Sequence, residues 1–308
     1  MTKKILLSLL VLLVSTSTSY LLAFNKKTPT FNHFTYPYGK YKALIMSFDD
    51  GCITDLKLVT LFNKYHITGT FNISSSFMGT TQIWSVKNGD TTRQTYIKEN
   101  QIVKIYKNHE IAVHGASHRN FLKISPEAVL EEVNTDIQKL SQLTHRKINS
   151  LAYPFGSSNN AIAQLIASTG LSNARTVKES LNFELADNFF LWNPTCRDDK
   201  ALDFSDSYLN LREKKLSVFY IWGHSWELEN EKRWNNMVGF CKIISNKKDI
   251  WYTGSGNLAN YLNALKKVTI GANEITNPKD NLPVWLNLSS GTIVLKPGHH
   301  IKITKLNY

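Results

Sequence analysis

Apolar runs of β type alternate with stretches of helical spacing along most of this chain. The first predicted strand is Tyr41–Phe48. After it, apolar residues recur at i, i+3, i+4 and i+7 from Leu58, which is typical of one buried helix face. The alternation continues to about Lys266, and this βαβα order predicts a parallel sheet or barrel.

The remaining predicted elements of residues 41–266 continue the alternation of strands and helices. Ser125 and Pro126 give the clearest helix start, as N-cap and first-turn residue. The other predicted strands are Thr70–Ile73, Glu110–Val113, Ile148–Tyr153, Asn173–Thr176, Leu216–Ile221 and Ile250–Tyr252. The other predicted helices lie near Ile97–Lys107, Ala161–Ser168, Trp234–Ser245 and Leu258–Lys267.

The two ends of the chain depart from this pattern. Two lysines, an apolar run Ile5–Val14 and a serine-rich stretch predict a signal peptide over residues 1–24, or a signal anchor that stays in the membrane. We therefore expect an exported protein, with residues 25–40 as a linker. Residues 267–308 change to short β-type runs separated by turns, and predict a small β-rich segment. We expect this segment to cover a barrel edge, with glycan binding as the alternative.

Composition narrows the classes of protein. The chain has 308 residues, 42% hydrophobic and 19% charged, which indicates a folded globular protein. Its net charge of +12 would attract anionic polymers, but the lysines are scattered without an arginine-rich helix, so we expect no nucleic-acid partner. The three cysteines include no C-x-x-C pair, so any metal must be held by histidines and carboxylates. The sequence does not determine the oligomeric state.

Four predicted strands end in unusual polar clusters. In parallel α/β folds the carboxyl ends of strands form the rim of the active site, so we expect the four clusters to converge. The clusters are Ser47-Phe48-Asp49-Asp50-Gly51, His114-Gly115-Ala116-Ser117-His118, Ala152-Tyr153-Pro154-Phe155-Gly156 and Trp222-Gly223-His224-Ser225-Trp226-Glu227.

Two of these clusters suggest a metal site. Adjacent carboxylates at Asp49 and Asp50 oppose each other's ionisation, and a bound cation is the usual remedy. His114 and His118 stand four residues apart, a spacing that lets two imidazoles reach one ion. Two histidines and one aspartate would form a facial ligand set with open positions for water and substrate.

The order of these motifs resembles the polysaccharide deacetylase family, the NodB homology domain of carbohydrate esterase family 4. Over residues 41–266 the resemblance implies a distorted (β/α) barrel with fewer than eight strands. It also implies a divalent metal, usually zinc, with Co²⁺, Ni²⁺ or Mn²⁺ as alternatives. In the family scheme the ligands are Asp50, His114 and His118, the general base is Asp49, the general acid is His224, the oxyanion donor is the backbone N–H of Phe155, and Pro154 fixes that loop.

The sequence departs from the family in two ways. The family's usual acidic motif between the third and last clusters is not recognisable, and one arginine is missing. Many members have an arginine, which orients the catalytic aspartate, where this chain has Ala152. We hypothesise that Arg197 supplies this guanidinium from another strand end. Trp222 and Trp226 are candidate sugar platforms, and Glu227 is a candidate partner for a sugar hydroxyl or for His224. Tyr153 is a further candidate for substrate contact.

The expected function is removal of N-acetyl groups from an amino-sugar glycan by an exported, metal-dependent hydrolase. The same site could serve an O-acetyl esterase acting on xylan-like substrates. A third hypothesis, motivated by the missing arginine, is a catalytically silent glycan-binding module. In each case the expected partner is a glycan, and contact with a membrane would involve only an uncleaved N-terminal segment.

Overall fold

The computed structural model describes residues 28–85 and 91–304. The predicted signal segment, residues 1–24, lies outside these residues. Among the helices within the described ranges, none combines the length and the apolar character needed to cross a membrane.

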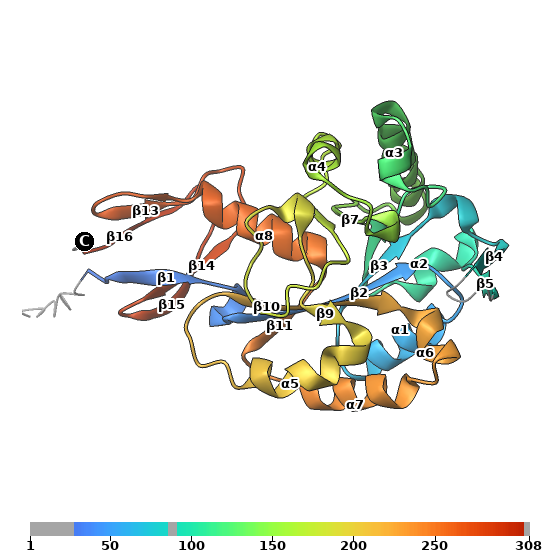
Figure 1. Ribbon diagram of the computed structural model, residues 1–308. Coiled ribbons are helices and arrows are strands. Elements are labelled where there is room, and N and C mark those ends of the chain that lie inside the picture. Colours follow the sequence, from blue (N-terminus) through green and yellow to red (C-terminus); the bar gives the residue numbers. More distant parts are fainter. Residues whose placement is uncertain (1–27, 86–90, 305–308) are drawn as a thin grey trace, which may run out of the picture.

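A curved parallel sheet forms the centre of the fold (Figure 1). Over the described residues it has eight strands in the order β8-β7-β6-β3-β2-β10-β9, with β11 paired to β2 as well. The strands are β2 (Lys42–Asp50), β3 (Gly69–Ile73), β6 (Glu110–Val113), β7 (Ser150–Ala152), β8 (Asn173–Arg175), β9 (Cys196–Arg197), β10 (Ser217–His224) and β11 (Ile250–Tyr252).

A single extended segment joins the two edges of this sheet. Trp192 forms a parallel bridge with Arg175 of β8, and four residues later β9 pairs with β10. Seven strands thus follow one another around a closed but irregular wall. The predicted distorted (β/α) barrel with fewer than eight strands is confirmed.

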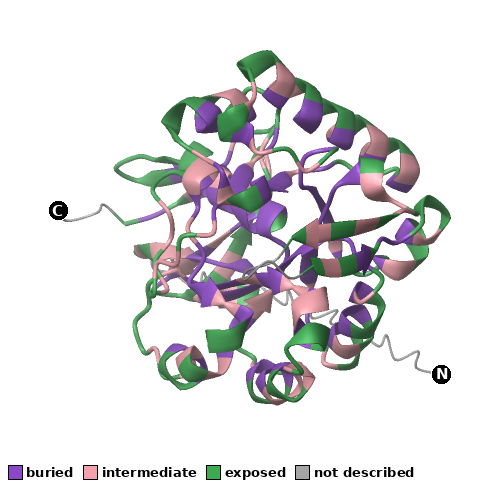
Figure 2. Cartoon of the chain, turned by 45° about the vertical axis from the view of Figure 1, so that its right-hand side comes forward, coloured by how far each residue is buried: buried purple, intermediate pink, exposed green. Residues whose placement is uncertain are grey.

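Helices cover the wall, and their buried faces turn inward (Figure 2). The Ser125 hydroxyl accepts a hydrogen bond from the Ala128 N–H, so the predicted cap does begin the longest helix. The helices are α1 (Asp55–Lys64), α2 (Ile102–Ile105), α3 (Pro126–Thr144), α4 (Asn160–Ala167), α5 (Ala201–Leu209), α6 (Ser225–Asn230), α7 (Trp234–Ile244) and α8 (Ser255–Lys267).

Strand β2 separates two hydrophobic cores. Leu44, Met46 and Phe48 pack in the core that includes residues of α1 and α7. Ala43 and Ile45, which alternate with them, pack in a second core with residues of α8 and of the C-terminal β segments. Because every residue of β2 is buried, this strand fixes the position of whatever follows it.

The β-rich segment predicted at the C-terminus is present, and it includes a strand from the N-terminal side. β1 (Phe31–Thr35) pairs antiparallel with β14, so the predicted linker 25–40 contains a strand. The structure of this short run is decided by its pairing with residues far along the chain, which the local sequence does not show. The partners are β14 (Val284–Leu288) and β15 (Gly291–Leu295), and a second sheet holds β12 (Thr269–Ile270), β13 (Glu274–Thr276) and β16 (His300–Lys302).

These C-terminal sheets lie at one end of the molecule. A short hairpin, β4 (Thr81–Ser85) and β5 (Thr91–Thr95), lies at the other end (Figure 1). The hairpin stands beside the carboxyl end of β2, because Cys52 forms a bridge with Tyr96 just after β5. It therefore borders the rim where the polar clusters were expected.

Candidate functional site

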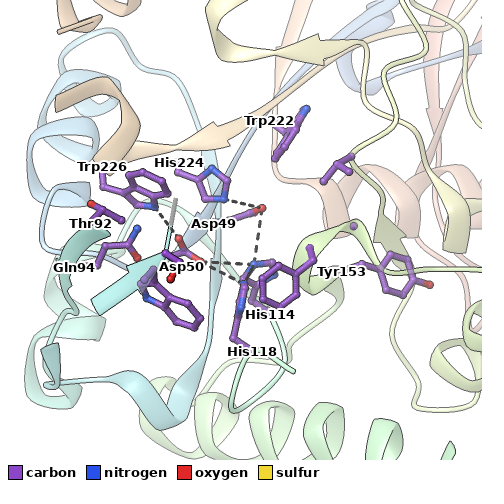
Figure 3. Close-up of a pocket in the computed structure, with 15 residues that line it drawn as sticks. Asp49, Asp50, Thr92, Gln94, His114, His118, Tyr153, Trp222, His224 and Trp226 are labelled. Carbon is purple, nitrogen blue, oxygen red and sulfur yellow. Dashed lines mark hydrogen bonds and ion pairs between the residues drawn. The ribbon is translucent and has the colours of Figure 1, made fainter. Parts of the chain in front are cut away.

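The four polar clusters converge on one cavity of about 290 Å³ at the carboxyl ends of the strands (Figure 3). Every cluster contributes to its lining. The lining residues are Asp49, Asp50, Trp84, Ser85, Thr92, Gln94, His114, His118, Tyr153, Phe155, Gly156, Val177, Trp222, His224 and Trp226. Three predicted site residues are not among the lining residues: Pro154, Arg197 and Glu227.

The backbone at the end of β2 turns both aspartates into the cavity. Strand alternation places Asp49 on the face of Ala43 and Ile45, and would place Asp50 on the opposite face. Asp50 instead has a φ of 82°, in the left-handed region that non-glycine residues rarely adopt, and Gly51 follows at 75°. The strained turn redirects the second carboxylate, as expected for an Asp-Gly strand end.

The two histidines are held by the loop that follows β6. Nδ1 of His114 lies 2.7 Å from the backbone oxygen of Ala152, so Nδ1 carries the proton and Nε2 faces the cavity with its lone pair. Gly115 allows the close turn, because a Cβ there would lie 3.2 Å from both Phe121 and Pro154. Pro154 thus supports the loop from behind.

Asp50, His114 and His118 form a candidate metal site, since one ligand atom of each lies within 4.8 Å of the others. The two Nε2 atoms are 3.2 Å apart, and each is 3.7 Å from Oδ1 of Asp50. These spacings suit an ion with bonds of roughly 2.0–2.2 Å. Burial and the neighbouring His114 lower the pKa of His118 to about 4, so it is a neutral imidazole at neutral pH, the form that binds metals. Trp226 donates to the other oxygen of Asp50 at 2.8 Å, leaving Oδ1 for the ion.

Asp49 is fully buried and is held by a guanidinium. Nη2 of Arg175 lies 2.5 and 2.6 Å from its two carboxylate oxygens, and Asn72 donates to Oδ1 at 2.8 Å. Burial alone would raise the pKa of Asp49, but the charges of Arg175, His114 and His224, together with the hydrogen bonds from Arg175, lower it below its ordinary value. Asp49 is therefore ionised at neutral pH.

The guanidinium beside Asp49 belongs to Arg175 and not, as hypothesised, to Arg197. Arg197 pairs with Glu227 at 2.8 Å and with Glu231 at 3.2 Å. The hypothesis was wrong because β9 lies on the far side of β10 from β2, whereas Arg175 reaches across the interior from the end of β8.

His224 faces Asp49 from the end of β10. Its Nε2 lies 4.0 Å from Oδ2 of Asp49, and its Nδ1 forms an ion pair with Glu227 at 3.1 Å. Burial alone would lower the pKa of His224, but Glu227 and the two aspartates raise it to about 9. The imidazole is therefore protonated at neutral pH and can donate a proton.

Aromatic side chains wall the cavity above these groups. Trp226 and Trp222 flank His224 with ring centroids 5.2 and 5.8 Å away, and the guanidinium of Arg175 lies 5.1 Å from the Trp222 ring centroid. Trp84 of the hairpin and Phe155 lie edge-on to His118. Such walls suit the faces of a sugar ring. Tyr153 lines the cavity, while its hydroxyl donates to the Phe190 carbonyl at 2.7 Å.

Several residues of the site were not found from the sequence. Arg175 is the last residue of β8 and lies one residue before the end of the predicted strand Asn173–Thr176, so the strand-end argument applied to the other clusters would have located it. Asn72 sits inside a strand, and Trp84 lies on a hairpin that no element was predicted for. Helix α3 contributes buried carboxylates, because Asp136 accepts from the backbone N–H of His114 at 3.0 Å and Glu132 from that of Ser117 at 2.8 Å.

The fold and the site together define a closed parallel α/β barrel with a carboxylate and histidine centre at its rim. Residues 40–174 match the family model described as polysaccharide deacetylase, which confirms the resemblance seen in the motifs. Among curated proteins none matches the chain.

One solved structure supports the fold, and two others align over a smaller part of the chain. A protein from Mycobacterium smegmatis, assigned to the polysaccharide deacetylases, aligns with a TM-score of 0.53 at 14% identity, over 78% of this chain and 96% of that one. Deacetylase PplD of Streptococcus pyogenes, in complex with acetate, aligns at 0.37 and 18% over 43% of this chain and 55% of its own. IcaB from Ammonifex degensii aligns at 0.37 and 16% over 44% and 59%. The chain thus spans little more than half of the last two structures.

Proposed function

We propose that this chain is an exported, metal-dependent hydrolase that removes N-acetyl groups from a glycan containing N-acetylated amino sugars. The observation that carries the proposal is the meeting of Asp50, His114 and His118 with an ionised Asp49 and a protonated His224 in one cavity. Hydrolysis of an amide requires a base, an acid and a site for developing negative charge, and these five residues supply all three.

The residues divide the chemistry between them. A divalent ion such as Zn²⁺, held by Asp50, His114 and His118, would polarise the acetyl carbonyl and lower the pKa of a bound water. Asp49 would take a proton from the attacking water, since Arg175 and Asn72 hold its carboxylate ionised and fixed. His224 would give its proton to the leaving amine. The backbone N–H of Phe155 is our candidate donor to the oxyanion, on a residue whose φ of 57° bends the loop at the rim.

The arginine contact also bears on the rival hypotheses. The silent binding module was motivated by the missing arginine at Ala152, and Arg175 now supplies a guanidinium to the catalytic carboxylate. A pure binding site gains nothing from a buried acid and base of this kind. An O-acetyl ester would present the same carbonyl. The esterase and the proposed N-deacetylase differ in the leaving group, which is an alcohol for the first and an amine for the second.

Acetate release by the full chain tests the proposal. Chitooligosaccharides, peptidoglycan and acetylated xylan are compared with zinc added and with a chelator, beside an Asp49→Asn variant. We expect zinc-dependent release from the N-acetylated substrates and about a 10³-fold lower rate in the variant. Release from acetylated xylan alone would favour the esterase, and tight glycan binding without release from any substrate would favour the binding module.

A further inference from the structure

The β4–β5 hairpin brings a buried glutamine to the catalytic cavity. Gln94, on β5, lines this cavity, and only 5% of its surface is exposed. The base of the hairpin is held by the turn that follows the two aspartates. There the N–H of Ile53 donates to the carbonyl of Thr95 at 2.8 Å, and the N–H of Ile97 donates to the carbonyl of Gly51 at 3.0 Å. Gln94 is therefore fixed beside the candidate metal site.

Hydrogen bonds determine which end of the Gln94 amide faces the cavity. Its Oε1 accepts from the hydroxyl of Tyr96 at 3.2 Å and from the thiol of Cys52 at 3.8 Å. The indole N–H of Trp84 donates to the same hydroxyl at 2.9 Å, so the proton of Tyr96 points at the amide. Among the hydrogen bonds between described residues, none uses Nε2 of Gln94. A donor on a buried side chain is costly when it has no acceptor, so this NH₂ group indicates that a ligand supplies one.

The position of Gln94 indicates which part of a substrate would meet it. Figure 3 shows Gln94 beside Asp50, with Tyr153 on the other side of that carboxylate. Tyr153 precedes the loop of Phe155, our candidate donor to the acetyl oxygen. An acetamido group has one strong acceptor, its carbonyl oxygen, and in the proposed reaction Phe155 and a bound ion would share it. The acceptors left for Gln94 are the oxygens of the sugar itself, and hydroxyls are the most numerous of them.

We propose that Gln94 donates from Nε2 to a hydroxyl of the sugar being deacetylated, and so favours sugar substrates over other acetyl compounds. Tyr96 is a positioning residue, because its hydroxyl acts through the amide. The proposal rests on the deacetylase function proposed above. It gives the hairpin a role in the choice of substrate, separate from the acid, the base and the metal ligands.

Two substrates test this proposal with the full chain. Chitotetraose has hydroxyls beside its acetamido groups, whereas p-nitrophenyl acetate has none. Gln94→Met keeps the length of the side chain and removes the donor, so the ratio of kcat/KM for chitotetraose to that for p-nitrophenyl acetate should fall about tenfold. Tyr96→Phe leaves the amide in place and lets it rotate, so the ratio should fall about threefold. Gln138→Met, at an exposed position on α3, is the matched control and should keep the ratio.

The ratio distinguishes recognition of the sugar from a structural role. A variant that merely loosens the cavity would lower turnover of both substrates together, and an unchanged ratio in Gln94→Met and Tyr96→Phe would overturn the proposal. No acetate from any substrate with the wild-type chain would overturn the deacetylase function instead. In that case calorimetry with chitotetraose still tests Gln94, since weaker binding by Gln94→Met than by Gln138→Met supports its role and equal binding refutes it.

Discussion

The two sides of the cavity treat neighbouring carboxylates in opposite ways. On the ligand side, Asp50 meets two imidazoles and one indole N–H. On the acid and base side, Asp49 meets the guanidinium of Arg175, and His224 meets Glu227, which in turn pairs with Arg197. Arginine thus balances charge on one side, while on the other the carboxylate faces two imidazoles, which are common ligands of divalent metals.

The difference shows that strand neighbours, and not position in the sequence, decide what an aspartate does. Asp49 and Asp50 are adjacent, but the first faces β8 across the barrel interior and the second is turned by its left-handed backbone toward the loop after β6. Helix α3 supports the ligand side through Asp136, whereas the other side depends on ion pairs. Substitutions on the ligand side should therefore change metal affinity, and substitutions on the acid and base side should change the rate and its pH dependence.

The largest expected effect separates the two carboxylates. Asp50→Asn should weaken zinc binding by at least about 100-fold, because it removes a ligand charge. Asp49→Asn should keep zinc and lose about 10³-fold in kcat, because it removes the base. Zinc affinity from competition with a chromophoric chelator, measured beside kcat, checks both. Equal zinc affinity in the two variants would contradict the division of roles.

Arg175→Ala should have an intermediate effect on the acid and base side. Without the guanidinium, burial raises the pKa of Asp49, so the base is protonated at higher pH and the acidic limb of the kcat/KM profile moves upward. We expect a loss of about 10- to 100-fold at neutral pH. The pH profile is the measurement, and zinc affinity should not change.

Controls for this prediction address folding. Removing a buried partner of a charge destabilises the protein by about 3–5 kcal/mol, so Arg175→Lys, which keeps the charge, should recover part of the activity and of the thermal stability. Arg212→Ala, at an exposed position, is the matched control. An unchanged acidic limb in folded Arg175→Ala would show that this arginine does not set the ionisation of Asp49.

Much of the barrel could be predicted from the sequence, because its strands are buried on both faces and read as continuous apolar runs. Glu110–Val113 and Ile250–Tyr252 were predicted with the bounds that β6 and β11 have. β1 and the β4–β5 hairpin were missed, since such short exposed strands depend on partners far along the chain or on cross-strand contacts.

The candidate site also contains residues that the sequence could predict and residues that it could not. The sequence could bring five residues to one cavity because each lies at, or shortly after, the carboxyl end of a strand at the same rim: Asp49, Asp50, His114, His118 and His224. The sequence could not decide whether Arg175 or Arg197 is the partner of Asp49. Arg175 ends β8 and Arg197 ends β9, and only the closure of the barrel decides which guanidinium reaches inward.

The smallest expected effect concerns His224. Because Glu227 helps to raise its pKa to about 9, the imidazole should be protonated below that pH and lose its proton as the pH rises through it. Glu227→Gln keeps the shape and removes the charge, so the alkaline limb of kcat/KM should move to lower pH by about one unit, with almost no loss at neutral pH and about a fivefold loss at pH 9. The exposed Glu131→Gln on α3 is the control. An alkaline limb that stays in place would show that Glu227 does not tune His224. A lower zinc affinity in Glu227→Gln would show that the two sides of the cavity are coupled.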